Sequence, residues 1–417
     1  MDMKKQVVIT GVGVVAPNGI GKQEFWDNCF AGVSGIKPIT LFDTSEYRCH
    51  LAGEIHDFQP EKYLGQKGLR NSDRTTLLAL VAAKLAIDDA ALEINDTNRH
   101  EIGVVLGSTM GSVHSISEFD KEGLREGPRY VNPSHFPNTV INSPASQVAI
   151  RFGLQGLNST ISTGFTASLD AIGYALNMLQ LGRARILLVG GVEELCIQTF
   201  LGFYKLGFLA TARNGTPLFY APFDLRRCGA LLGEGAVFFV LETIENAQAR
   251  GVSNYAGFLS YHTQFHPDSM YRYDPEARGS ISVMRQALAD AGLKADAINC
   301  ISSCANGNKA GDAMELTAVR DVFGQHINAI PLSAVKSMVG EAFSASAAFQ
   351  LAIAVGAIVR QEIPPTINVE QKDPLCNGHW IPSTSQQAQV THVLVNSFGP
   401  AGVLSSLITS AVTNGSN

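Results

Sequence analysis

The sequence predicts an α/β fold in which helices cover both faces of the β-sheets. Six stretches rich in Val, Ile and Leu have the length and near-continuous hydrophobicity of buried strands. They are 6–10, 102–107, 186–190, 236–241, 298–303 and 392–397. Stretches with helical periodicity separate them, at 72–93, 167–181 and 344–360. Strands that are apolar along their whole length are buried on both sides, so this alternation favours sheets that lie between layers of helices.

The chain of 417 residues is long enough for two domains or for one duplicated unit. A strand that feeds a glycine-bearing turn and then a helix of small residues occurs twice, at 158–181 and at 331–358. We therefore expect two similar halves, residues 1–250 and residues 251–417, with the division after the strand at 236–241.

Composition excludes several classes of protein. Hydrophobic residues make up 45% of the chain and charged residues 16%, as in a well-buried globular protein. The net charge of -6 and the lack of a basic run argue against nucleic acid as the main partner. The seven cysteines are scattered and form no CxxC pair, so we expect free thiols in the cytoplasm and no metal site. No apolar stretch has the length that a membrane span needs.

The segment GVGVVA at 11–16 matches, on paper, the glycine fingerprint of dinucleotide-binding folds. That fingerprint requires the glycine turn to open a helix that holds the pyrophosphate. Here Pro17, Asn18 and Gly19 follow, and no acidic residue ends a second strand about 20 positions further on. A structural turn is the better interpretation of these glycines.

The stretch STGFTASLDAIG, residues 162–173, has the character of a catalytic elbow, because small residues turn out of a strand and into a helix. The apex of such a turn normally carries a nucleophile. Here the apex is Phe165, whose benzyl group has no lone pair to donate.

Several segments besides this elbow form a set. They are QVAIRFGL before the elbow, PFD at 222–224 with GEGA at 233–236, SSCANGNKAGDAMEL, SAVKSMVGEAFSASAA and NSFGPAG. Together they resemble the β-ketoacyl synthase family along the whole chain. The resemblance implies a duplicated thiolase-like fold of five layers, αβαβα, with two mixed sheets, and an obligate dimer.

Active members of that family use an elbow cysteine, two histidines and a GFGG turn whose backbone holds the oxyanion. The resemblance places degenerate residues at all four parts, namely Phe165, Cys304, Glu341 and Pro400. It also identifies three retained residues, Lys336, Asp312 and Glu315, which can serve packing or internal polar bonding.

These replacements oppose condensation. Glu341 puts a potential negative charge where a malonyl carboxylate or an enolate needs stabilising. Pro400 has no N–H to donate, and losing one oxyanion donor typically costs about a hundred- to a thousandfold in rate. Cys304 could act as a new nucleophile only with a base beside it, so a buried, inert thiol is the favoured interpretation.

Within the family, such a subunit resembles the chain-length factor, or ketosynthase β subunit, of a type II polyketide synthase. The resemblance implies a catalytically inactive chain that forms a heterodimer with an active ketosynthase α subunit and shapes the tunnel that sets polyketide length. The elbow residue of many such factors is Gln, whereas here it is Phe165. No cofactor is expected on this chain itself; the partner uses acyl carrier protein with its phosphopantetheine.

The resemblance also suggests where the growing polyketide and the partner make contact. The length gate falls at Ser112, Ser115 and Phe119, which share one face of a helix at spacing i, i+3, i+7. The interface falls on 136–146, with Thr139, Val140 and Asn142 as its expected residues.

Two other functions stay open at this point. The chain could be a condensing or acyltransferase enzyme with an atypical site at Cys304, or a purely structural ketosynthase partner in polyene or fatty acid assembly. The sequence gives neither the length and reduction state of the product nor the identity of the partner.

Overall fold

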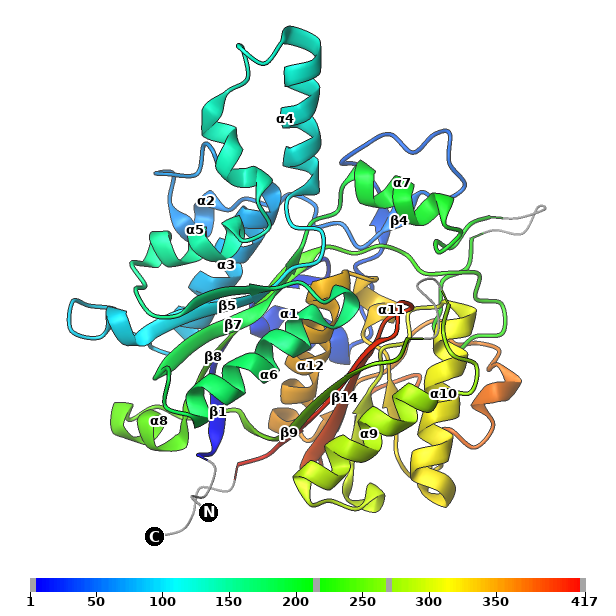
Figure 1. Ribbon diagram of the computed structural model, residues 1–417. Helices are drawn as coiled ribbons and strands as arrows, with labels where there is room; N and C mark the ends of the chain where they lie inside the picture. The colour runs from blue at the N-terminus through cyan, green and yellow to red at the C-terminus, as the bar shows by residue number, and fades with distance from the viewer. Residues whose placement is uncertain (1–4, 213–217, 268–271, 413–417) are drawn as a thin grey trace.

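The computed structural model of the protein describes residues 5–212, 218–267 and 272–412. Its centre is one mixed sheet of eleven strands in the order β11-β10-β14-β15-β9-β1-β8-β7-β5-β6, with β2 paired to β1 (Figure 1). All six expected strands are present, and β9 and β15 are strands that hydrophobicity did not single out.

The first half of the sheet consists of five strands. They are β1 (Val7–Ala16), β8 (Gly235–Thr243), β7 (Ile186–Glu193), β5 (Ile102–Gly107) and β6 (Asn158–Ile161). Along this order the pairs β1–β8 and β8–β7 are antiparallel, and the pairs β7–β5 and β5–β6 are parallel.

The second half repeats this order of pairings. Its strands are β9 (Ala256–Phe265), β15 (Val403–Ser410), β14 (His392–Phe398), β10 (Cys300–Ser302) and β11 (Leu332–Ser333). They too pair antiparallel, antiparallel, parallel and parallel. The expected duplication is therefore present in the backbone. The expected two mixed sheets are joined into one, because β1 and β9 pair at Val8–Gly257 and Ile9–Ala256.

Six helices complete the five expected layers (Figure 1). They are α3 (Arg74–Asp89), α5 (Ser143–Phe152), α6 (Ala167–Gln180), α12 (Ser346–Arg360), α9 (Arg278–Ala291) and α10 (Lys309–Phe323). α3 and α5 cover the first half of the sheet, α9 and α10 cover the second, and α6 and α12 lie between the halves. The division expected at 250–251 falls between α8 (Ile244–Arg250) and β9, and it stays a prediction.

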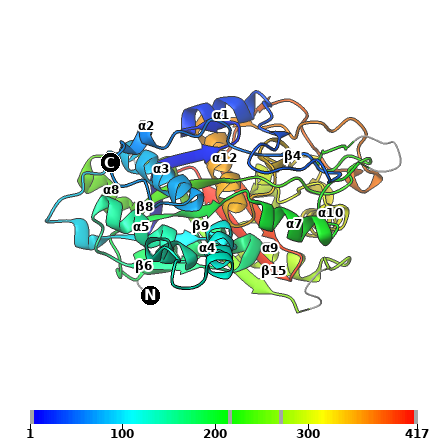
Figure 2. The same ribbon diagram turned by 90° about the horizontal axis from the view of Figure 1, so that it is seen from above.

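The remaining elements are short or lie at the periphery. They are α1 (Lys22–Phe30), α2 (Glu61–Leu64), α4 (Val113–Glu126), α7 (Ile197–Lys205), α11 (Lys336–Val339), β2 (Gly19–Ile20), β3 (Lys37–Pro38), β4 (Leu51–Ala52), β12 (Glu362–Ile363) and β13 (Gln386–Gln387). α4 stands away from the layers, followed by the 3₁₀ helix η2 (Pro133–Thr139), and none of the α4 residues is buried (Figures 1 and 2).

Two sequence expectations need correction. The glycines at 11 and 13 do not form a turn, because β1 continues through them to Ala16. A Cβ at Gly13 would lie 2.0 Å from the carbonyl oxygen of Ala82, so this glycine allows α3 to pack closely on the strand. One helical stretch, Phe343–Arg360, is also apolar and long enough to cross a membrane, contrary to expectation. It is 89% buried within the fold, as a core helix is.

Candidate functional site

The elbow has the geometry that the sequence predicts. The chain leaves β6 at Ile161, passes through the one-turn 3₁₀ helix η3 (Gly164–Thr166) and enters α6. Gly164 has φ 75°, a left-handed conformation that suits glycine. Its carbonyl oxygen accepts a hydrogen bond from Thr109 Oγ1 at 2.8 Å, and the carbonyl oxygen of Phe165 accepts one from Ser397 Oγ at 3.0 Å. The turn is thus fixed on both sides, with Phe165 at its apex.

The Phe165 ring packs edge-on against three other aromatic rings. Its centroid lies 5.3 Å from that of Phe343, 6.0 Å from Phe208 and 6.4 Å from Phe203, with interplanar angles of 80°, 63° and 79°. Phe203 also stacks on Phe343 at 4.5 Å. Edge-to-face pairs of this kind are worth about 0.5–1.5 kcal/mol each beyond their burial. We call these four residues the aromatic cluster.

The aromatic cluster does not fill the site completely. A cavity of about 640 Å³ lies in front of it, lined mostly by apolar side chains. The lining residues are Phe165, Phe203, Leu206, Gly207, Phe208, Arg272, Tyr273, Pro275, Asn308, Ala310, Pro400 and Ala401. Phe165 is half-buried. Its ring therefore forms one wall of an open cavity.

Cys304 is buried beside charged groups. Burial raises the pKa of its thiol well above the usual range, and the Glu315 carboxylate raises it further, while Lys336 opposes the shift. Its backbone N–H donates to Glu315 Oε1 at 3.2 Å, and its carbonyl oxygen accepts from Lys336 Nζ at 3.0 Å. A thiol with a raised pKa is a poor nucleophile, which agrees with the expected inert thiol.

Glu341 is fully buried and its two carboxylate oxygens have four donors. Oε2 accepts from Lys336 Nζ at 2.8 Å and from Asn306 Nδ2 at 2.7 Å. Oε1 accepts from Ser346 Oγ at 2.6 Å and from the Phe343 backbone N–H at 3.0 Å. The negative charge expected from the sequence is present but compensated by Lys336, and every lone-pair direction that a substrate could use is occupied.

The two retained acids, Asp312 and Glu315, accept hydrogen bonds from the groups around them. Asp312 accepts from the backbone N–H groups of Phe223, Asn306 and Gly307 and lies 3.1 Å from Arg227 Nε. Burial raises the pKa of Asp312 to about 6, although Arg227 opposes the shift. Glu315 accepts from Ser303 Oγ at 2.5 Å and from Asn396 Nδ2 at 3.1 Å. These contacts agree with the expected internal polar bonding.

Pro400 lines the same cavity as Phe165. It has no backbone N–H, and the neighbouring N–H of Gly399 is already donated to the carbonyl oxygen of Val403 at 2.9 Å. The structure therefore brings Phe165 and Pro400 to one cavity, with Lys336 and Glu341 bonded to each other in the interior behind them.

The three gate residues separate in the structure. Ser115 and Phe119 line a second cavity of about 390 Å³, together with polar residues that include His114, His135 and Asp73. Ser115 Oγ donates to Asp73 Oδ2 at 3.3 Å. Ser112 is not among the residues that line this cavity; it precedes α4 and is buried with its hydroxyl unpaired. Of the three expected gate residues, Ser115 and Phe119 thus line the same cavity.

The three interface residues lie where η2 ends and α5 begins: Thr139 ends η2, Val140 follows it, and Asn142 directly precedes α5. Thr139 is half-buried, whereas Val140 and Asn142 are exposed. Val140 is one of several exposed apolar side chains on the segment from α4 to α5, a group that the sequence interpretation missed and that we call the apolar patch. Its members are Leu124, Tyr130, Phe136, Val140, Ile141 and Ile150. Their apolar character alone could not predict that they are exposed, because the same residue types form the core.

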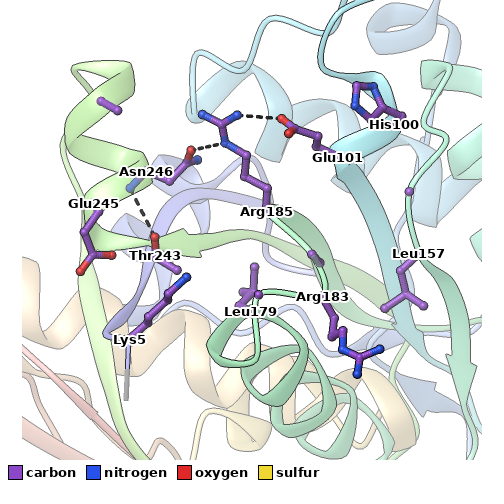
Figure 3. Close-up of a pocket in the computed structure, with 14 residues that line it drawn as sticks. Lys5, His100, Glu101, Leu157, Leu179, Arg183, Arg185, Thr243, Glu245 and Asn246 are labelled. Carbon is purple, nitrogen blue, oxygen red and sulfur yellow. Dashed lines mark hydrogen bonds and ion pairs between the residues drawn. The ribbon is translucent and has the colours of Figure 1, made fainter. Parts of the chain in front are cut away.

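A further cavity of about 540 Å³ lies elsewhere in the molecule (Figure 3). Arg185 crosses it to donate to Glu101 Oε2 at 2.8 Å and to Asn246 Oδ1 at 2.6 Å. Arg185 and Glu101 directly precede β7 and β5, so this cavity is at the amino ends of the parallel strands. The elbow follows the carboxyl end of β6, at the opposite edge, where ligands of open α/β sheets bind.

Within residues 5–212, 218–267 and 272–412, no group of His, Cys, Asp and Glu has the arrangement of a metal site. The seven cysteines, all of which the structure describes, are free.

The family described as "Beta-ketoacyl synthase, N-terminal domain" matches residues 4–247, and "Beta-ketoacyl synthase, C-terminal domain" matches residues 255–370. A "3-oxoacyl-[acyl-carrier-protein] synthase 2" of Coxiella burnetii is 35% identical over 410 residues, 98% of this chain and 99% of that protein. The protein with the same description from Synechocystis sp. is 34% identical over 401 residues, 96% of either chain.

Solved structures give the same fold. "The ishigamide ketosynthase/chain length factor" has a TM-score of 0.90 at 32% identity and covers 99% of this chain and 100% of that chain. A "type II PKS acyl-carrier protein in complex with its ketosynthase bound to the hexaketide" has a TM-score of 0.90 at 28% identity and covers 98% and 100%.

Proposed function

This chain belongs to the β-ketoacyl synthase family, and we propose that it is a non-condensing member that pairs with an active ketosynthase and shapes the tunnel in which a polyketide grows. In this function the partner performs condensation and binds acyl carrier protein with its phosphopantetheine. The chain itself binds no cofactor and acts in the cytoplasm.

The aromatic cluster carries this proposal. A condensing enzyme of the family requires a nucleophile at the elbow, and here a phenyl ring held by three others occupies that place. Removing the nucleophile leaves no covalent route for acyl transfer. Pro400 supplies no backbone N–H to an oxyanion, and the carboxylate oxygens of Glu341 already accept hydrogen bonds from Lys336 and three other donors. Replacing Phe165 by a nucleophile would therefore not restore the other parts of a condensing site.

The names of the sequence relatives favour the alternative, a condensing enzyme, since those from Coxiella burnetii and Synechocystis sp. are 3-oxoacyl synthases. On this chain such an enzyme would have to use Cys304. The buried thiol, with its raised pKa and its acidic neighbour Glu315, argues against that chemistry.

The apolar patch supports an obligate partner. Its members include Leu124 at 86% exposure and Ile150 at 73%, and exposed apolar side chains of this kind are what a protein partner would cover. Obligate interfaces bury on the order of 2,000–5,000 Å². The patch includes the expected interface residue Val140, and it includes Phe136, whose ring lies 6.1 Å from the Phe119 ring. Interface and gate are therefore neighbours.

Native mass spectrometry of the protein purified gently from its host tests the pairing. We expect a one-to-one complex with a second family member that has Cys at its elbow. A homodimer without such a companion would contradict the proposal, and acylation at Cys304 would support the alternative.

Substituting Ser115 by Phe tests the gate. The larger ring protrudes into the cavity that Ser115 and Phe119 share, so we expect a shorter product from the intact complex. Product length is measured by mass spectrometry, with Asp120→Asn as the control, because Asp120 is exposed on the same helix and does not line this cavity. An unchanged product from a stable complex rules out the gate and leaves a purely structural partner.

A further inference from the structure

The cavity beside Phe165, which we call the elbow cavity, has a lining rich in aromatic rings. Its volume of about 640 Å³ lies within the range of roughly 300–1,000 Å³ that is usual for small-molecule sites. Phe165 and Phe203 are only partly buried, so both rings stay accessible. Phe208 and Tyr273 complete the aromatic part of the lining. Because rings attract other rings through offset-stacked and edge-to-face contacts, this lining favours a flat aromatic ligand.

The polar side chains of the elbow cavity act mainly as hydrogen-bond donors. Asn308 Oδ1 already accepts the backbone N–H groups of Ala310 and Gly311, both at 3.1 Å, which leaves the amide NH₂ of Asn308 as a donor. The Tyr273 hydroxyl has no hydrogen-bond partner within residues 5–212, 218–267 and 272–412, so its O–H is available to a ligand. A ligand that satisfies these groups must supply acceptor oxygens.

The charge of the lining is positive. Among the described residues that line the elbow cavity, Arg272 is the one charged group, and no carboxylate is present. The Arg272 side chain is exposed and has no ion-pair partner in the part of the chain that the structure describes. A guanidinium is always charged, and its planar fork of donors matches a carboxylate. An unpaired cation beside an apolar cavity therefore favours a ligand that carries a carboxylate.

We propose that the elbow cavity binds a free aromatic carboxylic acid without reacting with it. The ring of the ligand packs against Phe165, Phe203 and Phe208, and its carboxylate pairs with Arg272. A thioester has no negative charge for the guanidinium, and Phe165 has no nucleophilic atom, so the ligand is a free acid that is bound noncovalently. This site goes beyond the proposed function, because it requires neither the ketosynthase partner nor the gate on α4.

Isothermal titration calorimetry with 2-naphthoate tests the site on the full chain, together with any partner that accompanies it through purification. Two comparison ligands each lack one feature: 2-naphthylmethanol has no charge, and decahydro-2-naphthoate has no aromatic ring. We expect each to bind about tenfold more weakly, because the first loses the charged pair with Arg272 and the second loses the ring contacts. Undetectable binding of 2-naphthoate at roughly millimolar concentration, or equal binding of either comparison ligand, overturns the proposal.

Two variants at exposed positions locate the binding. Ala310→Trp places a large ring in the lining and should weaken 2-naphthoate at least about tenfold, and circular dichroism checks that the variant is folded. Arg272→Gln should weaken 2-naphthoate about tenfold and leave 2-naphthylmethanol unchanged. Arg183→Gln, which removes an exposed arginine outside this cavity, is the control and should keep wild-type affinity. Wild-type affinity in Ala310→Trp or in Arg272→Gln overturns the proposal, since the ligand would then bind elsewhere.

The binding test and the test of pairing are independent. A homodimer without a ketosynthase companion would contradict the proposed function and leave the binding site in place. Undetectable binding of 2-naphthoate to an intact one-to-one complex would overturn the site and leave the pairing in place.

Discussion

At the scale of single residues, the site is changed in coordinated ways. Phe165 contributes to packing, Glu341 neutralises Lys336, and Pro400 withholds a donor. Phe165 and Glu341 thus make well-defined contacts of their own, and in the proposed function these residues stand where condensing relatives carry catalytic groups.

Substituting Phe165 by Cys should therefore not restore acyl transfer. The new thiol gains neither of the two imidazoles nor the second oxyanion donor that the family chemistry needs. Intact-mass measurement after incubation with acyl carrier protein charged with an acyl chain should detect no adduct, while an active 3-oxoacyl synthase assayed in parallel is acylated. Steady acylation at residue 165 followed by condensation would contradict the proposed inactivity.

Removing Glu341 should destabilise the protein strongly. Glu341→Ala leaves the ammonium of Lys336, which is 4% exposed, without its carboxylate, and breaking such a buried pair costs about 3–5 kcal/mol. The double variant Lys336→Met/Glu341→Leu leaves no unpaired charge and should recover part of this loss, although the donors of Asn306, Phe343 and Ser346 lose their acceptor. Urea unfolding measures both; equal losses in the single and double variants would show that the ion pair is not the cause.

At the scale of elements, α4, η2 and the start of α5 differ from the rest of the fold. α3, α6 and α12 bury most of their residues, whereas α4 buries none and has the apolar patch beside it. In the proposed function the ketosynthase partner would cover this helix.

Replacing Phe136 by Ser should weaken assembly with the ketosynthase. Burying a Phe side chain contributes about 1.5–3 kcal/mol, which corresponds to roughly ten- to hundredfold in the dissociation constant. Leu181→Ser is the matched control, because Leu181 is exposed at 70% after the end of α6, outside the patch. Equilibrium sedimentation of the complex measures both variants, and equal effects would remove the patch as the interface.

At the scale of the whole molecule, buried carboxyls set the pH dependence of stability. The raised pKa values of Asp312, about 6, and of Glu193 and Glu194, about 7, mean that their contribution is present below their unfolded values and is lost as pH rises. The pKa of Asp224 is held at about 2 by its hydrogen bonds with Arg226 and with backbone N–H groups, against the effect of burial, so its contribution is lost in strong acid.

The free energy of unfolding should therefore be highest near about pH 4–5 and fall toward pH 7, by up to about 1.4 kcal/mol per pH unit for each of the three carboxyls. Denaturant unfolding at a series of pH values measures this profile. Asp312→Asn should reduce the decline between pH 4 and about 6, and a profile that rises toward pH 7 would contradict the assignment.

Sequence determined the layered α/β architecture, because hydrophobic runs of strand length and helices of period 3.6 are local patterns. All six expected strands and the three expected helices exist, with boundaries that shift by a few residues or, in β1, by six. The residue types in the stretch 162–173 were enough to predict the elbow. They also showed that it carries no nucleophile, because the side chain of Phe165 is unreactive in any environment.

Tertiary structure alone decided what surrounds these residues. The antiparallel strands β9 and β15 pair over almost their whole length. The hydrophobicity pattern did not predict β9, because buried and partly exposed residues alternate along much of it. The rings of Phe203, Phe208 and Phe343 and the four donors of Glu341 come from segments far apart in the chain. Contacts of this kind depend on how the layers pack, which no local pattern encodes, whereas the loss of a reactive atom is a property of one residue.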